Sequence, residues 1–338
     1  MLAVVIVTYN SSDVIVPCLE SLIKSKDEIL KILIVDNAST DATIHKIREW
    51  SSTKSITYDE RSNKVDSLIE ADCTLLRLSV NCGFAGAVNQ GLTSQMRDPK
   101  CDIFWILNPD CEVEVETASA FKKCARSTEQ FSFMGSRILY RETPGLIQSD
   151  GGRVGYWTGI CRNVNQGSNP EIAIRPDPTT LDFISGASLV VSRKLIETIG
   201  LMREDYFLYF EEVEWASRRG DLPLVLCEDA LVHHHGGTAI GSGSVTRLAS
   251  PLALYFNYRN RIRFIGGVRP IALPISLMAS AARIGKIFSK GAWPEAWAGL
   301  LGLCQLPPPN SVRSAISEDA AKFAFTYRQH TSSNSNKT

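Results

Sequence analysis

Three glutamates, Glu211, Glu212 and Glu214, stand among four aromatic residues in the stretch FLYFEEVEW. Carboxylates are seldom fully buried unless they are paired or bound to a ligand. One interpretation is an amphipathic helix whose charged face meets solvent. The other is a general base in a dry site, where burial raises the pKa of the carboxyl toward the pH at which it works. The stretch by itself leaves both interpretations open.

Four other polar clusters each follow an apolar run in the first 110 residues. They are residues 8–10 (TYN), 36–39 (DNAS), 81–86 (NCGFAG) and 108–110 (NPD). Such residues favour ordinary turns. They also stand where ligands bind in open parallel sheets, at the carboxyl ends of the strands. Four successive clusters at one predicted sheet edge favour a binding site.

The segments that would position these clusters alternate between strand and helix. Apolar runs predict strands at residues 2–8, 31–36, 73–78 and 102–107. Helical spacing predicts helices at residues 13–24, 42–50 and 84–94, and the polar segment 51–72 is expected to be a loop or a frayed helix. This alternation indicates an α/β fold with a parallel sheet covered on both faces.

The second half is less regular. Residues 148–160 predict a glycine-rich hairpin or loop, residues 181–191 a strand broken at Gly186, and residues 223–228 and 230–233 short strands. Helices are predicted at residues 194–199, 204–219 and 252–264. Helices with proline breaks are predicted after residue 267, before a polar tail, 331–338, that is expected to be disordered.

Charge and cysteine content narrow the class of protein. The 36 basic residues balance 36 acidic ones, which argues against a general nucleic-acid-binding protein. Nine cysteines without a CxxC pair indicate reduced thiols in the cytosol. The apolar N-terminus lacks the basic region of a signal peptide. The apolar stretch 270–282 is shorter than the ~20 residues that span a bilayer, so no transmembrane helix is expected. A peripheral membrane contact stays open.

The order of the motifs resembles the family 2 glycosyltransferases of GT-A fold, and most of all their bacterial rhamnosyltransferase branch. The motifs are VVIVTYNSSDVIVPCLESL, ILIVDNASTD, NCGFAGAVNQG, WILNPDCEV, FISGASLVVSRKLIETIG, FLYFEEVEW and LVHHHGGT. The resemblance implies a Rossmann-like mixed, mainly parallel sheet flanked by helices, with a helical C-terminal extension. Residues 1–110 would form the nucleotide-sugar-binding half, 111–265 the acceptor-binding and catalytic half, and 266–330 the extension.

The resemblance also implies a donor site at the sheet edge. Asp36 is expected to bond the nucleotide base, and the glycines of the 81–86 turn would let backbone amides approach a phosphate. Arg259 would hold the diphosphate or, with Arg261 and Arg263, face anionic lipid head groups; an exposed basic helix face is the alternative. The implied donor residues are Thr8, Tyr9, Asn10, Asp36, Asn37, Ser39, Asn81, Gly83, Phe84, Ala85, Gly86, Asn89, Asn108 and Arg259.

Asp110 and His234 are the residues implied for a divalent cation, Mg²⁺ or Mn²⁺. The NPD stretch stands where the family carries its DXD motif, with Asn108 in place of the first aspartate. A cation there would neutralise charge on the diphosphate leaving group. Adjacent strand residues cannot all face one metal, so residues 233–235 (HHH) do not form a zinc site by themselves. The register favours His234, with His235 as the alternative.

Glu212 matches the position of the family's catalytic base. That base is an aspartate in an E-D or D-D pair at the start of a helix, and here the pair is Glu211-Glu212. An inverting transferase needs a carboxylate that takes the proton of the acceptor hydroxyl, much as inverting glycosidases activate water. The residues expected to contact the acceptor are Trp157, Gly186, Glu211 and Trp215.

These expectations describe an inverting, metal-dependent hexosyltransferase of bacterial surface polysaccharide synthesis. The donor would be a dTDP- or UDP-sugar, with dTDP-L-rhamnose as the leading example, and the acceptor a glycan or lipid-linked glycan. The enzyme is expected in the cytoplasm or at the inner face of the cell membrane. Two alternatives stay open: a sugar-phosphate nucleotidyltransferase, against which VTYNSS lacks a basic glycine-rich loop, and a non-catalytic nucleotide-sugar-binding protein.

Overall fold

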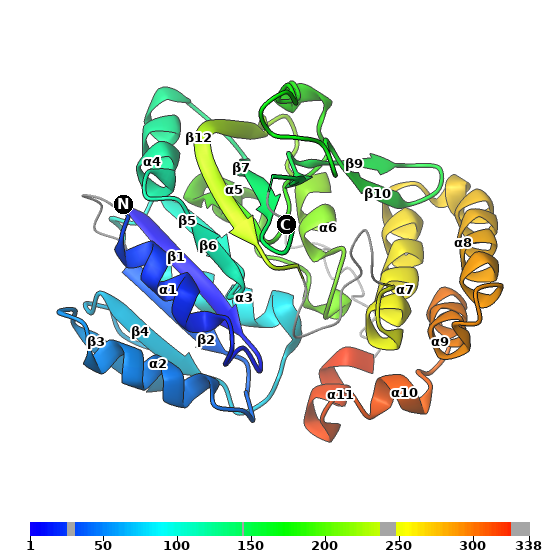
Figure 1. Ribbon diagram of the computed structural model, residues 1–338, viewed down its shortest axis with the longest axis horizontal. Coiled ribbons are helices and arrows are strands. Elements are labelled where there is room, and N and C mark those ends of the chain that lie inside the picture. The colour runs from blue at the N-terminus through cyan, green and yellow to red at the C-terminus, as the bar shows by residue number, and fades with distance from the viewer. Residues whose placement is uncertain (26–30, 144, 237–247, 326–338) are drawn as a thin grey trace, which may run out of the picture.

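A ten-stranded, mainly parallel sheet forms the centre of the protein, as the computed structural model shows for residues 1–25, 31–143, 145–236 and 248–325 (Figure 1). Its strand order is β3-β4-β2-β1-β5-β11-β7-β12-β6, with β8 paired to β7. The strands are β1 (Leu2–Thr8), β2 (Lys31–Asp36), β3 (Tyr58–Ser62), β4 (Cys73–Arg77), β5 (Ile103–Leu107), β6 (Cys111–Val113), β7 (Phe133–Tyr140), β8 (Ile147–Ser149), β11 (Ser188–Ser192) and β12 (Val225–His234). A separate hairpin joins β9 (Gly152–Gly155) to β10 (Ile160–Asn163).

Helices cover both faces of this sheet, each over its own apolar core. The even-numbered apolar residues of β1 pack with α1 (Ile15–Ile23), α2 (Thr43–Ser52) and α4 (Thr117–Ser127). The odd-numbered ones join the core that includes α3 (Gly83–Gln95), α5 (Arg193–Ile199) and α6 (Glu211–Ser217). Burial on both faces explains why β1 and β2 are continuous apolar runs. The predicted fold class is confirmed.

The parallel strands bring their carboxyl ends to one edge. β1 runs parallel to β2 and β5, and β2 runs parallel to β4. The register sets Thr8 beside Asp36. β11 then runs antiparallel between β5 and β7, so the sheet takes strands from both predicted halves of the chain. The polar clusters that follow β1, β2, β4 and β5 therefore share one edge.

Three predicted elements differ in the structure. The predicted loop at residues 51–72 contains the edge strand β3, whose residues YDERS pair with β4 through the backbone and carry no apolar run. The two short strands predicted at residues 223–233 are one strand, β12, with a register shift between Leu226 and Leu231. The helix predicted at 204–219 divides into the 3₁₀ turn η2 (Glu204–Tyr206), a loop, and α6.

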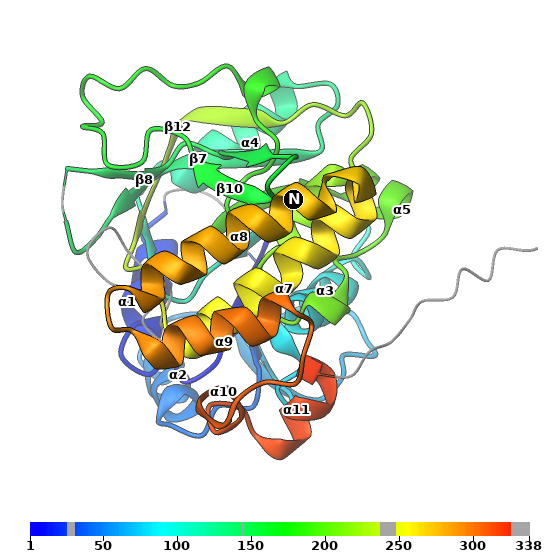
Figure 2. The same cartoon turned by 90° about the vertical axis from the view of Figure 1, so that its right-hand side faces the viewer.

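The C-terminal region is a helical layer at one side of the molecule, seen face-on in Figure 2. It consists of α7 (Pro251–Val268), η3 (Pro270–Ala272), α8 (Leu273–Phe288), α9 (Trp293–Leu303), α10 (Asn310–Arg313) and α11 (Glu318–Phe325). The helical run Pro270–Phe288 is long and apolar enough, by length and composition alone, to cross a membrane; this corrects the expectation that the stretch is too short. Core helices of water-soluble proteins pass the same test. The predicted tail at 331–338 lies outside the described residues.

Candidate active site

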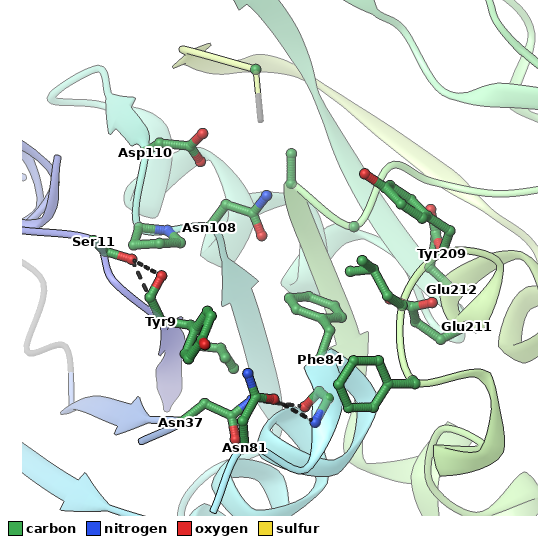
Figure 3. A pocket seen from close by; sticks show the side chains of 18 of the residues that line it. Tyr9, Ser11, Asn37, Asn81, Phe84, Asn108, Asp110, Tyr209, Glu211 and Glu212 are labelled. Atoms are coloured by element: carbon green, nitrogen blue, oxygen red, sulfur yellow. Dashed lines mark hydrogen bonds between the residues drawn. The ribbon is translucent and has the colours of Figure 1, made fainter. Parts of the chain in front are cut away.

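One pocket gathers much of the predicted chemistry. Its volume is about 300 Å³, and it lies between the ends of β1, β2 and β5 and the start of α6. Figure 3 shows Tyr9, Asn37 and Asn81 on one side and Glu212 on the other. The predicted site residues that line the pocket are Tyr9, Asn37, Asn81, Gly83, Phe84, Asn108, Asp110, Gly186, Glu211, Glu212 and His234.

Four predicted donor residues instead fasten the loops that follow β1 and β2. Thr8 Oγ1 donates to Asp36 Oδ1 at 2.9 Å, and the Ser39 amide donates to Asp36 Oδ2 at 3.0 Å. Asn10, at a positive φ of 49°, donates its amide to Ser39 Oγ at 2.9 Å. Asp36 is fully buried and both of its oxygens already accept hydrogen bonds. Its predicted bond to the nucleotide base therefore stays a prediction.

In the turn before α3, two backbone amides donate hydrogen bonds to other groups of the protein. The Gly83 amide donates to Asn81 Oδ1 at 2.9 Å, and the Phe84 amide donates to the Phe207 carbonyl at 2.8 Å. Gly83 has a φ of +82°, and a Cβ atom there would lie 2.6 Å from the Phe207 oxygen, so only glycine fits. Asn37 Nδ2 also donates to Asn81 Oδ1 at 2.9 Å. The structure therefore does not offer these two amides to a phosphate; the turn sets Asn81 and Phe84 into the pocket wall.

Ala85, Gly86 and Asn89 pack α3 against its surroundings rather than lining the pocket. Ala85 is fully buried, and a Cβ atom on Gly86 would lie 2.9 Å from Cys82 Sγ. Asn89 Nδ2 donates to the Met202 carbonyl at 2.8 Å, and Asn89 Oδ1 accepts the Met202 amide at 3.1 Å. These contacts join α3 to the segment that leads to η2, so they support the site from behind.

Asp110 and His234 meet at the end of the sheet, where β12 pairs with β6. His234 Nε2 lies 3.1 Å from Asp110 Oδ1, and His234 Nδ1 lies 2.7 Å from Gln148 Oε1. Because an amide oxygen only accepts, Nδ1 donates to Gln148 and Nε2 is the ring nitrogen that faces Asp110. A proton or a divalent cation would bridge Nε2 and the Asp110 carboxylate in this arrangement. Gln148, which the sequence analysis did not single out, thus sets the tautomer of His234.

Cys111 lies in the same cluster but does not suit a metal. Its Sγ and the ligand atoms of Asp110 and His234 lie within 4.8 Å of one another. The thiol donates to the Ala187 carbonyl at 3.3 Å, and burial, followed by the charge of Asp110, raises the pKa of Cys111 well above its ordinary value. Mg²⁺ and Mn²⁺ prefer oxygen ligands to the soft sulfur of a thiolate. The fitting donor set is therefore the carboxylate of Asp110 with His234 Nε2, and Asn108 Nδ2 lies 3.5 Å from that nitrogen.

The two flanking histidines have other partners. His233 Nε2 lies 2.9 Å from Glu114 Oε1, and His235 Nε2 lies 3.7 Å from Glu112 Oε1. Of the three, His234 is the one that lines the pocket. This agrees with the choice made from the strand register.

The loop before α6 has an uncommon backbone. Phe207, Tyr209 and Phe210 have φ values of 63°, 66° and 73°, in the region that side chains other than glycine rarely adopt. The loop ends the 3₁₀ turn η2 and starts α6 at Glu211. Because of this loop, α6 begins at the pocket, and its first two residues, Glu211 and Glu212, line the pocket (Figure 3).

Asn260 and Arg259, from the YRN motif on α7, hold this loop in place. Asn260 Nδ2 lies 2.9, 2.7 and 2.9 Å from the carbonyl oxygens of Tyr206, Leu208 and Tyr209. Arg259 donates through Nη2 to the Tyr206 carbonyl at 2.8 Å and is 2% exposed. This corrects both expectations for Arg259, since a buried guanidinium bonded to backbone carbonyls neither lines the pocket nor forms an exposed basic face.

The three glutamates have different surroundings. Burial and then the charge of Glu212 raise the pKa of Glu211 to about 8, and Glu211 Oε2 has no hydrogen-bond partner among the described residues. Burial also raises the pKa of Glu212, which remains partly exposed in the pocket. Glu214 is buried and pairs with Arg218 at 3.0 Å. Glu212 thus combines access to the pocket with a raised pKa, the properties of a general base.

Two predicted acceptor residues lie elsewhere. Trp215 is fully buried, and its Nε1 donates to the Gly200 carbonyl at 2.9 Å. Trp157 lies between β9 and β10, with the Arg269 guanidinium 4.1 Å above its ring. Neither residue lines the pocket. The structure therefore leaves Gly186 and Glu211 as the predicted acceptor residues that do.

Comparisons with known proteins identify the family of the chain. The model of a family described as glycosyl transferase family 2 matches residues 3–200. The chain is 25% identical over 264 residues to the low-salt glycan biosynthesis hexosyltransferase Agl10 of Haloferax volcanii, covering 77% of this chain and 74% of that protein. It is 24% identical over 271 residues to an N-acetylglucosaminyl-diphospho-decaprenol L-rhamnosyltransferase of Mycobacterium tuberculosis, covering 74% of this chain and 81% of that protein.

Two solved structures share the fold. S. aureus TarS 1-349 in complex with UDP-GlcNAc has a TM-score of 0.54 at 14% identity, covering 96% of this chain and 83% of that chain. The mannosyltransferase PcManGT of Pyrobaculum calidifontis, in complex with GDP-Man and Mn²⁺, has a TM-score of 0.50 at 17% identity. The match covers 90% of this chain and 85% of that chain. With a family match over more than half of its length, the chain belongs to glycosyl transferase family 2 and is a glycosyltransferase of GT-A fold.

Proposed function

We propose that the enzyme transfers a sugar, with inversion at the anomeric carbon, from a nucleotide-diphosphate donor to a hydroxyl group of a glycan or lipid-linked glycan. The donor that we propose is dTDP-L-rhamnose. The observation that carries the proposal is the place of Glu212, partly exposed and on the side of the pocket opposite Asp110. A base and a leaving-group site on opposite sides are what in-line displacement with inversion needs.

The protein's own residues would act as follows. Tyr9, Asn37 and Asn81 line the side of the pocket proposed for the nucleotide. The Glu212 carboxylate takes the proton of the acceptor hydroxyl as that oxygen bonds to the anomeric carbon. The bond from this carbon to the diphosphate oxygen breaks, and the nucleoside diphosphate leaves with the bonding electrons on the side of Asp110. Phe84 and the loop residues Phe207 and Tyr209, which line the pocket, would exclude water from this space.

Asp110 and His234 would hold a divalent cation, which when bound neutralises charge on the departing diphosphate. The donor set of one carboxylate and one imidazole, with Gln148 fixing the ring, fits such an ion. Mg²⁺ prefers an all-oxygen shell, so an imidazole ligand favours Mn²⁺. We therefore propose Mn²⁺ as the more effective of the two.

The resemblance to a decaprenol-linked rhamnosyltransferase supports the rhamnose donor and the lipid-linked acceptor. The proposed setting is the cytoplasm, at the inner face of the membrane, during synthesis of a surface polysaccharide. All nine cysteines are free, which suits a reducing compartment.

A panel of nucleotide sugars tests this function. Thermal unfolding of the enzyme would be followed with dTDP-L-rhamnose, UDP- and GDP-sugars, each with Mn²⁺, Mg²⁺ or chelator. We expect the largest metal-dependent rise in Tm with dTDP-L-rhamnose and Mn²⁺, and none in Asp110→Ala. The anomeric configuration of the product, read by NMR, should be inverted. A retained configuration, or equal stabilisation with and without metal, would contradict the proposal.

A further inference from the structure

In helices α8 and α9, small residues make up much of the buried side, and several large apolar residues are exposed. A helix on the surface of a water-soluble protein turns its large apolar side chains inward. In α8 the buried residues are Ser276, Ser280 and Ile284. Ser276 Oγ donates to the Thr158 carbonyl at 2.9 Å, and Ser280 Oγ accepts from Arg261 at 3.2 Å. Two of the three buried residues of α8 are therefore serines that bond to other parts of the protein, and the third is Ile284.

The inner side of α9 carries small residues. Ala296, Gly299 and Gly302 are buried against α7. A Cβ atom on Gly299 would lie 3.0 Å from the Tyr258 ring, and one on Gly302 would overlap the Tyr255 carbonyl. Small residues between closely packed helices, with large apolar ones outside, are typical of helices in an apolar environment.

Ile284 and Leu303 are buried, but several other large apolar side chains of both helices point outward. On η3 and α8 they recur at Ile271, Ile275 and Met278, which are 76%, 39% and 66% exposed. On α9 they recur at Trp293, Trp297 and Leu300, which are 59%, 54% and 37% exposed. Each set follows the i, i+4, i+7 spacing of one helix side.

The two sets form a single surface. The rings of Phe288 and Trp293 lie 4.1 Å apart between centroids and join the end of α8 to the start of α9. Figure 2 shows the two helices side by side on the side of the molecule that faces the viewer. We call this surface, made by residues 271, 275, 277, 278, 288, 293, 297 and 300, the outer apolar face.

Basic residues accompany the outer apolar face. Arg283, Lys286 and Lys290 are exposed on or just after the last turns of α8, and Arg269 precedes η3. Residues 267–306 contain these four basic residues and one acidic residue, Glu295, although the whole chain has no net charge. The segment thus concentrates positive charge beside exposed tryptophans, the composition of helices that lie in a membrane interface.

We propose that the outer apolar face of α8 and α9 binds a membrane surface that carries anionic lipid head groups. The apolar side chains enter the boundary between head groups and acyl chains, and Arg283, Lys286 and Lys290 contact lipid phosphates. A second copy of the chain on a two-fold axis would bring these like charges together, which disfavours it as the occupant. A spanning α8 would place Arg283 and Lys286 in hydrocarbon, which is costly.

The outer apolar face differs from the lipid-binding surface that the sequence analysis expected at the arginines of α7. Arg259 and Arg261 are buried, at 2% and 8% exposure, and Arg263 donates to the Asp205 carbonyl at 2.8 Å. The cations that we propose for lipid contact are therefore those on α8 and in the turn that follows it. The inference goes beyond the proposed reaction and does not depend on it, because membrane binding needs neither donor nor acceptor.

The test is sedimentation of the full chain with vesicles of phosphatidylcholine, with or without phosphatidylglycerol. We expect binding to the anionic vesicles that weakens as salt rises. Lys286→Gln with Lys290→Gln should lower the partition coefficient about 30-fold, from two lost cations. Trp293→Ser with Trp297→Ser should reduce binding to background. Unchanged far-UV circular dichroism and Tm would show that these exposed substitutions leave the fold intact.

The matched control is Ile172→Ser with Ile174→Ser, since these residues are 80% and 88% exposed but lie outside the outer apolar face. This variant should bind vesicles like the wild type. The proposal is overturned if the wild type does not sediment with anionic vesicles, if neutral vesicles bind it equally, or if the tryptophan variant binds as well as the control. A wild-type dimer that Trp293→Ser with Trp297→Ser converts to a monomer, without vesicle binding, would identify a second copy as the occupant and overturn it too.

Discussion

Gly186 lies directly beside Glu212 in the wall of the pocket: a Cβ atom on Gly186 would lie 3.8 Å from the Cβ, Cγ and Cδ atoms of Glu212. That separation is ordinary van der Waals contact, and Gly186 does not adopt a positive φ. The absence of a side chain at this position therefore serves space rather than backbone conformation. The space lies beside the carboxylate that we propose as the base, where the acceptor hydroxyl must arrive.

Substitutions of graded size at Gly186 test this relationship. Gly186→Ala should fold normally and raise the KM for acceptor, because one methyl group narrows the approach. Gly186→Leu should fill the space beside Glu212 and lower turnover on the order of 10²-fold through misplaced acceptor. Donor affinity, measured by thermal shift, should stay at the wild-type value in both. Equal loss of donor binding would place Gly186 in the donor site instead.

The base itself is tested by Glu212→Gln, which keeps the shape of the side chain but cannot take a proton. We expect donor binding to persist and turnover to fall by ~10²–10⁴-fold, the usual contribution of general-base catalysis. Glu212→Asp is the control, because the resemblance to family 2 glycosyltransferases implies an aspartate at the position of Glu212. It should retain part of the activity. Near-normal turnover of a folded Glu212→Gln enzyme would remove Glu212 from the mechanism.

Glu211 should make stability depend on pH. Burial and the charge of Glu212 raise its pKa to about 8, above its value of ~4.3 in an unfolded chain. Between these two values the folded state holds a proton that the unfolded state releases. The contribution of Glu211 to the free energy of unfolding is therefore greatest below pH ~4.3 and is lost as the pH rises to about 8.

Urea unfolding of the wild type and Glu211→Gln at several pH values measures this effect. The variant keeps a neutral side chain, so it should gain in stability relative to the wild type as the pH rises from about 5 to about 8. Glu214→Gln is the comparison: burial also raises the pKa of Glu214, but the charge of Arg218 opposes that rise, so this variant should follow the same pH trend with a smaller amplitude. Parallel pH curves for the wild type and Glu211→Gln would contradict the assignment.

The sequence predicted those parts of the fold that depend on local patterns. β1 and β2 occupy the predicted residues because β-branched apolar runs buried on both faces leave a strong signal. β3 was missed because its residues are polar and its pairing with β4 is a backbone interaction at the sheet edge. Such a strand differs from a loop only in its neighbours, which the sequence does not reveal.

The site divides in a similar way. Residues that follow strands, such as Asp110 and Asn37, line the pocket because the topology of the sheet brings them to one edge. The prediction of one helix over residues 204–219 was wrong because a loop interrupts it. The carbonyl groups of this loop bond to Asn260, about 50 residues later in the chain. Trp215 was misassigned because an aromatic side chain in a motif can equally well fill the core.

Gln148 should control metal binding without touching the metal. Its Oε1 accepts the Nδ1 proton of His234 at 2.7 Å and so directs Nε2 toward Asp110. Gln148→Leu removes that acceptor and should weaken Mn²⁺ affinity about 10–100-fold, measured by calorimetry with nucleoside diphosphate present. Gln148→Glu restores an acceptor and should keep most of the affinity. If both variants bind Mn²⁺ like the wild type, His234 does not depend on Gln148.

Asn260 should couple stability to turnover through the loop that precedes Glu211. Its Nδ2 approaches three carbonyl oxygens, and Phe207, Tyr209 and Phe210 keep positive φ angles against their intrinsic preference. Asn260→Ala leaves buried carbonyl groups without this donor and should cost about 1–3 kcal/mol in the free energy of unfolding. The released loop should also lower kcat by moving Glu212, with a smaller effect on nucleotide affinity, because the side of the pocket that we propose for the nucleotide is formed by other elements.

Asn257→Ala provides the matched control on the same helix. Asn257 Nδ2 donates to the carbonyl of Ala253, one turn earlier, and among the described residues it makes no hydrogen bond to the loop. Its loss should cost less than about 1 kcal/mol and leave kcat unchanged. The two variants therefore separate a general weakening of α7 from the release of the loop. Equal effects of the two on kcat would mean that the geometry at Glu212 is set by the helix as a whole and not by Asn260.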